Sequence, residues 1–219
     1  LLAQIALDKG HKIQFFDEST DASFNSSTYT GGSVLEYCIV EYAGEGLYVR
    51  SSGPFVNYSE FRYNSVDGIN AESISGSTFL WVTNCDIHDN NRGIYASGDY
   101  GDNAIISYSN VHDNTPNGGV YSLTASFTYN SIKNNTSSSD DYGSGITVDG
   151  SHSDIHHNII RDNNGSPGMV IKASSGGDIN NNIIFHSAGE YAVYGDNISG
   201  PQYFKNNLII GGNTFFNLE

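Results

Sequence analysis

Short apolar segments recur along the chain at a nearly constant spacing. The segments LEYCIVEY, VNYSEFRY, VTNCDIHD, ISYSNVHD, FTYNSIKN, IHHNIIRD, INNNIIFH and FKNNLIIG align without gaps. One column of this alignment is small or carries an amide, and its members lie 21 to 28 residues apart: Cys38, Ser59, Cys85, Ser109, Asn130, Asn158, Asn182 and Asn207. Two positions later a column is always apolar: Val40, Phe61, Ile87, Val111, Ile132, Ile160, Ile184 and Ile209. Such self-similarity indicates a stack of similar structural units.

A second short strand is expected in each repeat. A Gly followed by an alternating segment recurs between the aligned segments, as in Gly46-Leu47-Tyr48-Val49 and Gly145-Ile146-Thr147-Val148. The bends between strands are rich in Gly and Asn and leave no room for a helix of ordinary length. A unit of this size buries its apolar side only when it stacks on its neighbours. Leucine-rich repeats would need a Leu-rich consensus, and propeller blades would need roughly 40 residues, so the pattern favours a coil.

These segments resemble the right-handed parallel β-helix repeat, in which I-x-x-N-x-I is preceded by G-I-x-V. The resemblance covers residues 33–217 and implies an all-β fold, a single-stranded right-handed parallel β-helix (solenoid) of roughly eight coils. We assign residues 33–219 to the β-helix and residues 1–32 to an N-terminal cap or a partial first coil, because an open strand edge needs a cover. Repeat-like sequence continues to Asn217, as expected of a fragment of a longer protein.

The family that these repeats resemble includes pectate-lyase-like enzymes, other polysaccharide lyases and hydrolases, epimerases, phage tailspikes, adhesins and periplasmic metal-assembly proteins. The resemblance therefore implies an extracellular or periplasmic protein whose partner is a polysaccharide, and it leaves open whether the protein is an enzyme. We expect a monomer.

The small and amide-bearing column has a structural explanation. Stacked Asn side chains can hydrogen-bond to one another from coil to coil, so Asn130, Asn158, Asn182 and Asn207 are predicted to form a ladder. Cys38 and Cys85 occupy the same column two rungs apart, about 10 Å at the usual strand spacing. This distance is beyond the reach of a disulfide, so two free thiols are predicted.

Composition excludes two classes of partner. The chain has 219 residues with 9 Lys and Arg against 24 Asp and Glu, a formal net charge of −15. Nucleic-acid binding depends on cations that displace counterions from phosphates, so no nucleic-acid partner is expected. No apolar run reaches about 18 residues, so no membrane insertion is expected.

Basic side chains are predicted to form a line along the outside of the rod. The position after the apolar column carries a basic or titratable nitrogen in five successive repeats: Arg62, His88, His112, Lys133 and Arg161. At the strand spacing this line spans about 20 Å, a length suited to an extended acidic polysaccharide. The alternative is local neutralisation, by Asp89, Asp113 and Asp162 in the next column or by pairing of Glu41 with Arg62.

Calcium is the only candidate cofactor that the sequence suggests. Lys133 and Arg161 should face each other on adjacent strands, and Asp140 and Asp141 in the intervening turn are candidate partners for them. The same two carboxylates could hold a hard cation such as Ca²⁺, although the spacing of a dedicated calcium loop is absent. No metal-ligand set is expected from the histidines, because strand alternation sends His156 and His157 to different sides.

A second outward line follows the recurring Gly and is rich in tyrosine. It is predicted to contain Tyr48, Asn70, Tyr95, Tyr121, Thr147, Val170 and Val193. Tyr95 and Tyr121 are candidate sugar-binding residues, because aromatic faces pack against the C–H faces of sugars. Stacked tyrosines also suit a strand surface with no ligand.

Resemblance to β-helix polysaccharide lyases implies a catalytic base. In those enzymes a basic side chain removes the proton α to a uronate carboxylate while a cation neutralises that carboxylate. The segment GMVIKASSGGDINNNII resembles the strand that carries this lysine, which maps the role onto Lys172. The arginine that those lyases carry on the following coil is missing, and the comparable stretch EYAVYGDN offers Tyr191 and Tyr194, of which Tyr194 is the candidate acid.

Three functions remain open from the sequence. The first is a carbohydrate-associated module that binds an acidic polysaccharide, the second is a lyase-like enzyme acting on uronate polymers, and the third is a non-catalytic structural or adhesin spacer. The N-T-D, D-D and G-H-G motifs of pectin hydrolases and the Y-G-x-D-P-H type signature of alginate epimerases do not occur in the chain.

Overall fold

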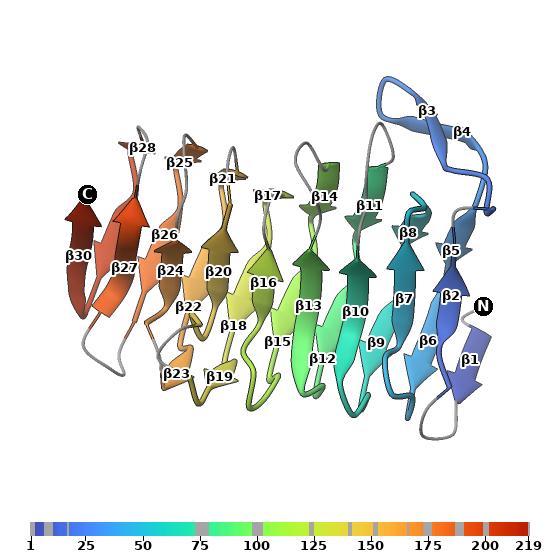
Figure 1. Cartoon of the computed structure of the whole chain (residues 1–219), viewed down its shortest axis with the longest axis horizontal. Helices are drawn as coiled ribbons and strands as arrows, with labels where there is room; N and C mark the ends of the chain where they lie inside the picture. The colour runs from blue at the N-terminus through green and yellow to red at the C-terminus, as the bar shows by residue number, and fades with distance from the viewer. Residues whose placement is uncertain are drawn as a thin grey trace.

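The chain winds into a rod of stacked coils (Figure 1). The computed structural model describes residues 3–6, 11–16, 18–72, 79–97, 103–122, 125–139, 142–150, 153–165, 167–172, 177–186, 191–198 and 202–218. The regular structure within these ranges consists of β-strands, with no helix. The predicted all-β parallel solenoid is therefore confirmed. Within these same ranges no helix is long and apolar enough to span a membrane.

Three parallel sheets form the sides of the rod. Sheet A has nine strands, in the order β1 (Ala3–Ala6), β6 (Cys38–Glu41), β9 (Glu60–Arg62), β12 (Asp86–His88), β15 (Asn110–His112), β18 (Ser131–Lys133), β22 (Ile159–Arg161), β26 (Ile183–Phe185) and β29 (Leu208–Ile210). Sheet B also has nine, in the order β2 (Ile13–Phe15), β7 (Leu47–Arg50), β10 (Asp67–Glu72), β13 (Arg92–Ser97), β16 (Val120–Ser122), β20 (Ile146–Asp149), β24 (Met169–Lys172), β27 (Tyr191–Ile198) and β30 (Asn213–Leu218). Sheet C has eight: β5 (Val34–Glu36), β8 (Phe55–Asn57), β11 (Phe79–Thr83), β14 (Asn103–Ser107), β17 (Ala125–Thr128), β21 (Ser153–His156), β25 (Gly177–Asn180) and β28 (Gln202–Lys205).

Two smaller elements lie outside these sheets. An antiparallel hairpin of β3 (Ser23–Asn25) and β4 (Thr28–Gly31) lies at the N-terminal end of the rod, and β19 (Thr136–Ser137) pairs in parallel with β23 (Asn164–Gly165). Residues 1–32, expected as a cap or a partial first coil, thus contribute β1 to sheet A, β2 to sheet B and the hairpin.

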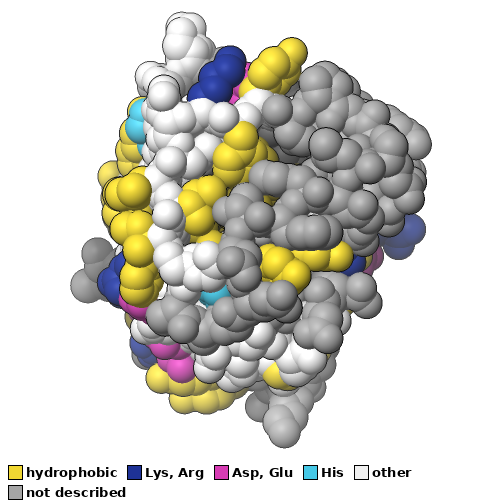
Figure 2. All heavy atoms as spheres, turned by 90° about the vertical axis from the view of Figure 1, so that its left-hand side faces the viewer, with side chains coloured by type: hydrophobic (Ala, Val, Ile, Leu, Met, Phe, Trp, Pro, Cys, Tyr) yellow, Lys and Arg dark blue, Asp and Glu magenta, His cyan; other side chains and the backbone are white. Residues whose placement is uncertain are grey.

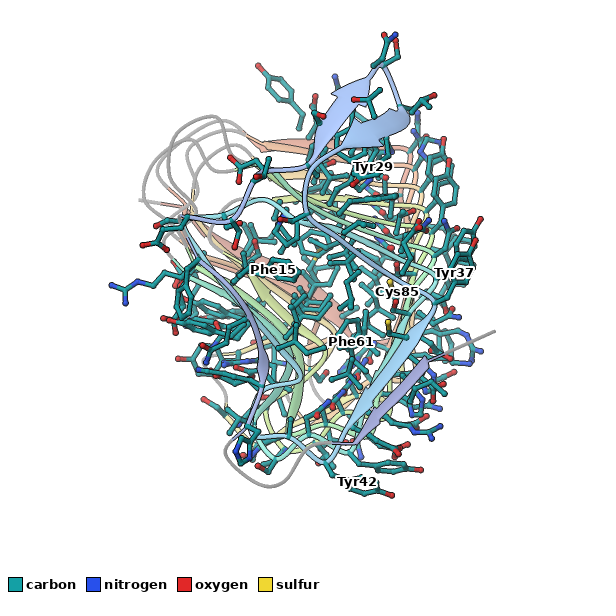
Figure 3. All side chains as sticks on the ribbon, turned by 90° about the vertical axis from the view of Figure 1, so that its right-hand side faces the viewer. Phe15, Tyr29, Tyr37, Tyr42, Phe61 and Cys85 are labelled. Carbon is teal, nitrogen blue, oxygen red and sulfur yellow. The ribbon has the colours of Figure 1, made fainter. Side chains whose placement is uncertain are left out.

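The apolar column of the repeat fills the interior of the rod. Its members Val40, Phe61, Ile87, Val111, Ile132, Ile160 and Ile184 are each 0% exposed, and Ile209 is partly buried. Figure 3, which looks along the rod, shows Phe15, Phe61 and Cys85 directed into the interior, whereas Tyr37 and Tyr42 point outward. Burial of each such Ile or Phe contributes about 1.5–3 kcal/mol, so this column and the equally buried positions of the other two sheets are the main source of stability.

Each coil turns from sheet C to sheet A at a single residue in the left-handed backbone region. The corner column consists of Tyr37, Tyr58, Asn84, Tyr108, Tyr129, His157, Asn181 and Asn206, with φ between 46° and 60°. This conformation costs a non-glycine residue about 1–2 kcal/mol. The corner backbone is held by hydrogen bonds to the next coil, as from Tyr58 N to the Thr83 carbonyl at 3.3 Å.

The predicted asparagine ladder is confirmed. Nδ2 of Asn130 donates to Oδ1 of Asn158 at 3.1 Å, and the same bond links Asn158 to Asn182 and Asn182 to Asn207 at 3.0 Å. Ser109 N continues the ladder by donating to Asn130 Oδ1 at 3.0 Å. Each amide thus satisfies the buried polar groups of a bend that water does not reach.

A second ladder, which the sequence analysis missed, runs three positions after the apolar column. Its members are Asn64, Asn90, Asn114, Asn135 and Asn163, each joined to the next by a side-chain hydrogen bond of 2.9 to 3.1 Å. In one later coil a histidine replaces the asparagine: His186 lies beside Gly168 as Asn163 lies beside Gly145. The recurring Asn in the segments RYN, HDN and KNN was the available signal.

Both cysteines are free, as predicted. Cys38 and Cys85 are buried, and burial raises the pKa of both thiols, that of Cys85 to about 12. The two side chains therefore act as small apolar groups within the ladder column.

The predicted tyrosine line is wrong at its last member. Val170 on β24 pairs with Tyr194 on β27, whereas Val193 pairs with Met169. Met169 and Val193 are each 0% exposed and belong to the core, which leaves the bulkier Tyr194 on the outer face.

Replacing Asn114, which is 0% exposed, tests the second ladder. The change Asn114→Ala leaves the Asn90 amide and the Ile87 carbonyl without their partner. Unpartnered buried polar groups cost about 1–3 kcal/mol each, so we expect the free energy of unfolding in urea to fall by about 3 kcal/mol. Asn110→Ala, on the exposed face of the same coil, is the control and should change stability by less than about 0.5 kcal/mol. Equal effects of the two changes would contradict a structural role for the ladder.

Candidate functional site

The structure aligns the predicted line of basic side chains. Arg62 pairs in register with His88, and His88 with His112. Lys133 and Arg161 follow on β18 and β22. We call Arg62, His88, His112, Lys133 and Arg161 the basic stripe, which lies on the outer face of sheet A.

Carboxylates accompany the first three members of the stripe. Arg62 Nε donates to Glu41 Oε2 at 2.7 Å and Arg62 Nη1 to Glu60 Oε1 at 2.6 Å. His88 Nε2 lies 3.0 Å from Glu60 Oε1, and its Nδ1 lies 2.8 Å from Asp89 Oδ2.

His112 repeats this arrangement one coil further along. Its Nε2 lies 2.9 Å from Asp86 Oδ1 and its Nδ1 lies 2.6 Å from Asp113 Oδ2. The imidazole rings of His88 and His112 stack at 4.9 Å. The hydrogen bond to Asp86 raises the pKa of His112 against the opposing effect of burial. Burial alone would raise the pKa of Asp86, but His112 outweighs it and lowers that pKa.

The last two members of the stripe differ from each other in ion pairing. Arg161 is paired with the neighbouring Asp162, whereas Lys133 has no ion pair among the described residues. Asp140 and Asp141, the predicted partners of this pair and the predicted calcium ligands, lie outside the described residues. In Figure 2 several Lys and Arg side chains are likewise seen next to Asp or Glu side chains. Local pairing lowers the attraction that the stripe offers to a polyanion, and binding by the stripe stays a prediction.

Tyr95 and Tyr121 lie side by side on the outer face of sheet B, in the predicted order. Their rings stack with centroids 5.2 Å apart, and Arg92 lies 4.2 Å from the Tyr95 ring centroid. The Tyr121 hydroxyl donates to Asp149 Oδ2 at 3.1 Å, and burial, followed by the charge of Asp149, raises the tyrosine pKa.

Lys172 and Tyr194 lie on the adjacent strands β24 and β27 of the same face. Lys172 is two positions along β24 from Val170, the register partner of Tyr194. The Lys172 ammonium lies 5.4 Å from the centroid of the Tyr142 ring. The segment around Tyr142 covers the neighbouring outer-face positions, because Gly143 N donates to Thr147 Oγ1 and Thr147 is 0% exposed.

A pocket beside the hairpin was not found from the sequence. It has a volume of about 420 Å³ and is lined by Ser27, Phe55, Asn57, Trp81, Thr83, Asn84, Ser107 and Tyr108. We call it the aromatic groove. The lining comes from the hairpin turn (Ser27), from the strands β8, β11 and β14, and from Asn84 and Tyr108 of the corner column.

Aromatic packing fixes the hairpin against sheet C and so shapes this groove. The ring of Phe24 lies 4.3 Å from that of Trp81 and 5.3 Å from that of Phe55, between ring centroids. Tyr29 stacks on Phe55 at 5.3 Å. The Trp81 Nε1–H is buried and has no hydrogen-bond partner among the described residues, which costs about 1–3 kcal/mol.

The polar lining of the groove consists of amides and hydroxyls. Asn84 Nδ2 donates to Asn57 Oδ1 at 3.0 Å, and Ser107 Oγ donates to Thr83 Oγ1 at 3.2 Å. All eight lining residues are uncharged at neutral pH. Aromatic faces combined with such donors and acceptors suit a neutral, hydroxyl-rich ligand. The single Trp of the chain was the available sequence signal.

The described histidines and acids outside these surfaces form no evident metal site. Among the described residues no group of three or more His, Cys, Asp or Glu is placed to hold a metal ion. His156 and His157 contact each other edge to face, and His157 stacks on Tyr129 at 4.8 Å. His186 is 1% exposed, and burial lowers its pKa.

The bond between His112 and Asp86 should make stability depend on pH. The raised pKa of His112 gives a stabilisation that is full below its unfolded pKa of about 6.5 and is lost as the pH rises through the folded pKa. The lowered pKa of Asp86 gives a second stabilisation, which is lost as the pH falls through the folded pKa of Asp86. A double-mutant cycle of His112→Gln and Asp86→Asn, measured by urea unfolding, should give a coupling below about 1 kcal/mol near pH 5.5 that shrinks by pH 9. A coupling that is constant over this range would contradict the assignment.

Known proteins with a similar sequence pattern or structure support the assignment of the fold as a β-helix. The family model described as the right handed beta helix region matches residues 24–164 and 82–215. The crystal structure of the periplasmic alginate epimerase AlgG is similar, with a TM-score of 0.70 and 15% sequence identity over 95% of this chain and 58% of that one. The chain thus spans little more than half of that enzyme, and the likeness shows the fold alone. No curated protein matches the sequence significantly. The matched family model, which covers most of the chain, shows that this protein belongs to the right-handed β-helix family.

Proposed function

We propose that this protein is a carbohydrate-binding β-helix module and that the aromatic groove is its binding surface. The observation that carries the proposal is the lining of the groove, which combines the rings of Trp81 and Tyr108 with amide and hydroxyl groups. Such a lining offers faces for the C–H side of a sugar ring and hydrogen-bond partners for its hydroxyls. We also propose an extracellular or periplasmic location, which the periplasmic location of the structurally similar epimerase supports.

The charge distribution favours a neutral saccharide over an acidic one in the groove. None of the described residues that line the groove is basic, so none can pair with a uronate carboxylate. The chain as a whole has a formal net charge of −15, which disfavours the approach of a polyanion. An acidic polysaccharide would instead have to bind along the basic stripe, where Lys133 is the member that has no paired carboxylate among the described residues.

Tyr108→Ala tests the groove. Calorimetric titration with cello-, xylo-, manno- and chito-oligosaccharides should detect binding by the wild type that weakens about three- to tenfold in the variant, because one aromatic contact contributes about 0.5–1.5 kcal/mol. Tyr42→Ala is a matched control, since Tyr42 is also exposed, has positive φ and stacks on one tyrosine outside the groove. Equal weakening in both variants would contradict binding at the groove, and silence of the wild type across a glycan array would favour a spacer.

A second candidate function is β-elimination on a uronate polymer. It is favoured by the placement of Lys172 and Tyr194 on adjacent strands of one face. Lys172 in its neutral form would take the proton α to the carboxylate, and Tyr194 would protonate the departing glycosidic oxygen as the C–O bond breaks and a C=C bond forms.

Lyase activity would be visible as ultraviolet absorbance of the unsaturated product from alginate, pectate or glycosaminoglycans. This candidate predicts that Lys172→Ala abolishes the absorbance increase, whereas Lys205→Ala, a change on sheet C, does not. Wild-type protein that forms no product from any of these polymers rules the lyase out.

A further inference from the structure

The corner column between sheets C and A carries an aromatic stack on each side of one gap. Tyr37 and Tyr58 stack with ring centroids 5.2 Å apart and 9° between their planes. Tyr108 and Tyr129 stack at 5.0 Å and 3°, and His157 continues the stack at 4.8 Å. All of these rings are exposed at one edge of the rod.

Asn84 occupies the rung between the two stacks. Tyr58 N donates to the carbonyl of Thr83, and Asn84 N donates to that of Ser107, so Tyr58, Asn84 and Tyr108 are consecutive members of the column. Asn84 Nδ2 donates to Asn57 Oδ1 at 3.0 Å, and both residues line the groove. Neither Tyr58 nor Tyr108 therefore has a ring partner on the side that faces Asn84 in the described structure.

The gap has the size of one ring. Two rungs separate Tyr58 from Tyr108, or about 9–10 Å at the usual strand spacing. A flat ring placed midway would lie about 4.8 Å from each tyrosine. The tyrosine pairs of this column already stack at 5.0 and 5.2 Å, so the inserted ring would continue the column at its own spacing.

The aromatic groove opens onto this gap, because Asn84 and Tyr108 both line it. A ring between the two tyrosines would therefore have its edge against Asn84 and the hydroxyls of Ser107 and Thr83. Hydrogen-bonding groups at the edge and aromatic faces on both sides match a pyranose, which has C–H groups on its faces and hydroxyls around its rim. A nucleobase, a flat aromatic ring that could also enter the gap, is disfavoured by the net charge of −15 on this chain.

We infer that one pyranose ring of the bound saccharide is sandwiched between Tyr58 and Tyr108 above Asn84, in line with the corner column. The inference rests on the proposed function and names the position of one sugar residue within it. Tyr58 lies outside the lining of the groove, so its participation distinguishes the sandwich from binding in the groove alone.

Asn84→Tyr tests the sandwich by filling the gap. Tyrosine is already the residue at both neighbouring positions of the column, where φ is 46° and 51° against 52° at Asn84, so the variant is compatible with the backbone. We expect affinity for the oligosaccharide that the wild type binds to fall at least about tenfold in calorimetric titration. Asn181→Tyr is the matched control, because Asn181 is an exposed member of the same column with φ of 56°, and it should bind as the wild type does.

Tyr58→Ala keeps the inference testable if Asn84→Tyr is unstable in thermal unfolding. It removes one face of the gap and should weaken binding about three- to tenfold. Both Tyr58→Ala and Tyr37→Ala remove the stack between Tyr37 and Tyr58. Because Tyr37→Ala leaves the ring of Tyr58 at the gap, this variant should bind as the wild type does. A wild type that binds no saccharide overturns the proposed function, whereas a wild type whose affinity falls in Tyr108→Ala but not in Asn84→Tyr or Tyr58→Ala overturns the sandwich alone.

Discussion

The vertical register between coils is the constraint on which the rest of the structure depends. A strand slipped by one residue would turn its apolar side chains outward and its polar ones into the core. The two asparagine ladders oppose such a slip, because a buried amide that lost its neighbours would leave several polar groups without partners. The same register that keeps Phe61 and Ile87 in the core sets the spacing of the exposed tyrosines, so stability and the candidate binding surface have one physical origin.

Features that repeat could be predicted from the sequence. The column of Val40 and its equivalents, the ladder from Asn130 to Asn207 and the free thiols all follow from residue type at a constant position in the coil. The second ladder could have been read in the same way, since Asn114 and its equivalents recur at one position. The error at Val193 arose where two apolar residues adjoin, because hydrophobicity alone does not say which of Ala192, Val193 and their neighbours faces inward.

Features that occur once in the chain escaped the sequence analysis for a physical reason. The hairpin of β3 and β4 has no equivalent in other coils, so no column indicates that Phe24 folds back onto Trp81. The basic stripe was aligned correctly, but its electrostatics depend on Glu60 and Asp86, which lie two residues earlier on the same strand face. Alternation along a strand places those acids beside the stripe, and only side-chain geometry shows which of them pair.

The ladders also give the rod a direction. In each bond between ladder amides the Nδ2 of one coil donates to the Oδ1 of the following coil, so these bonds all run the same way along the axis. A whole coil can therefore be duplicated or deleted during evolution with its amide inserted head to tail, whereas a change of part of a coil breaks the row. Variation in the length of such proteins is thus expected to proceed in steps of one complete turn.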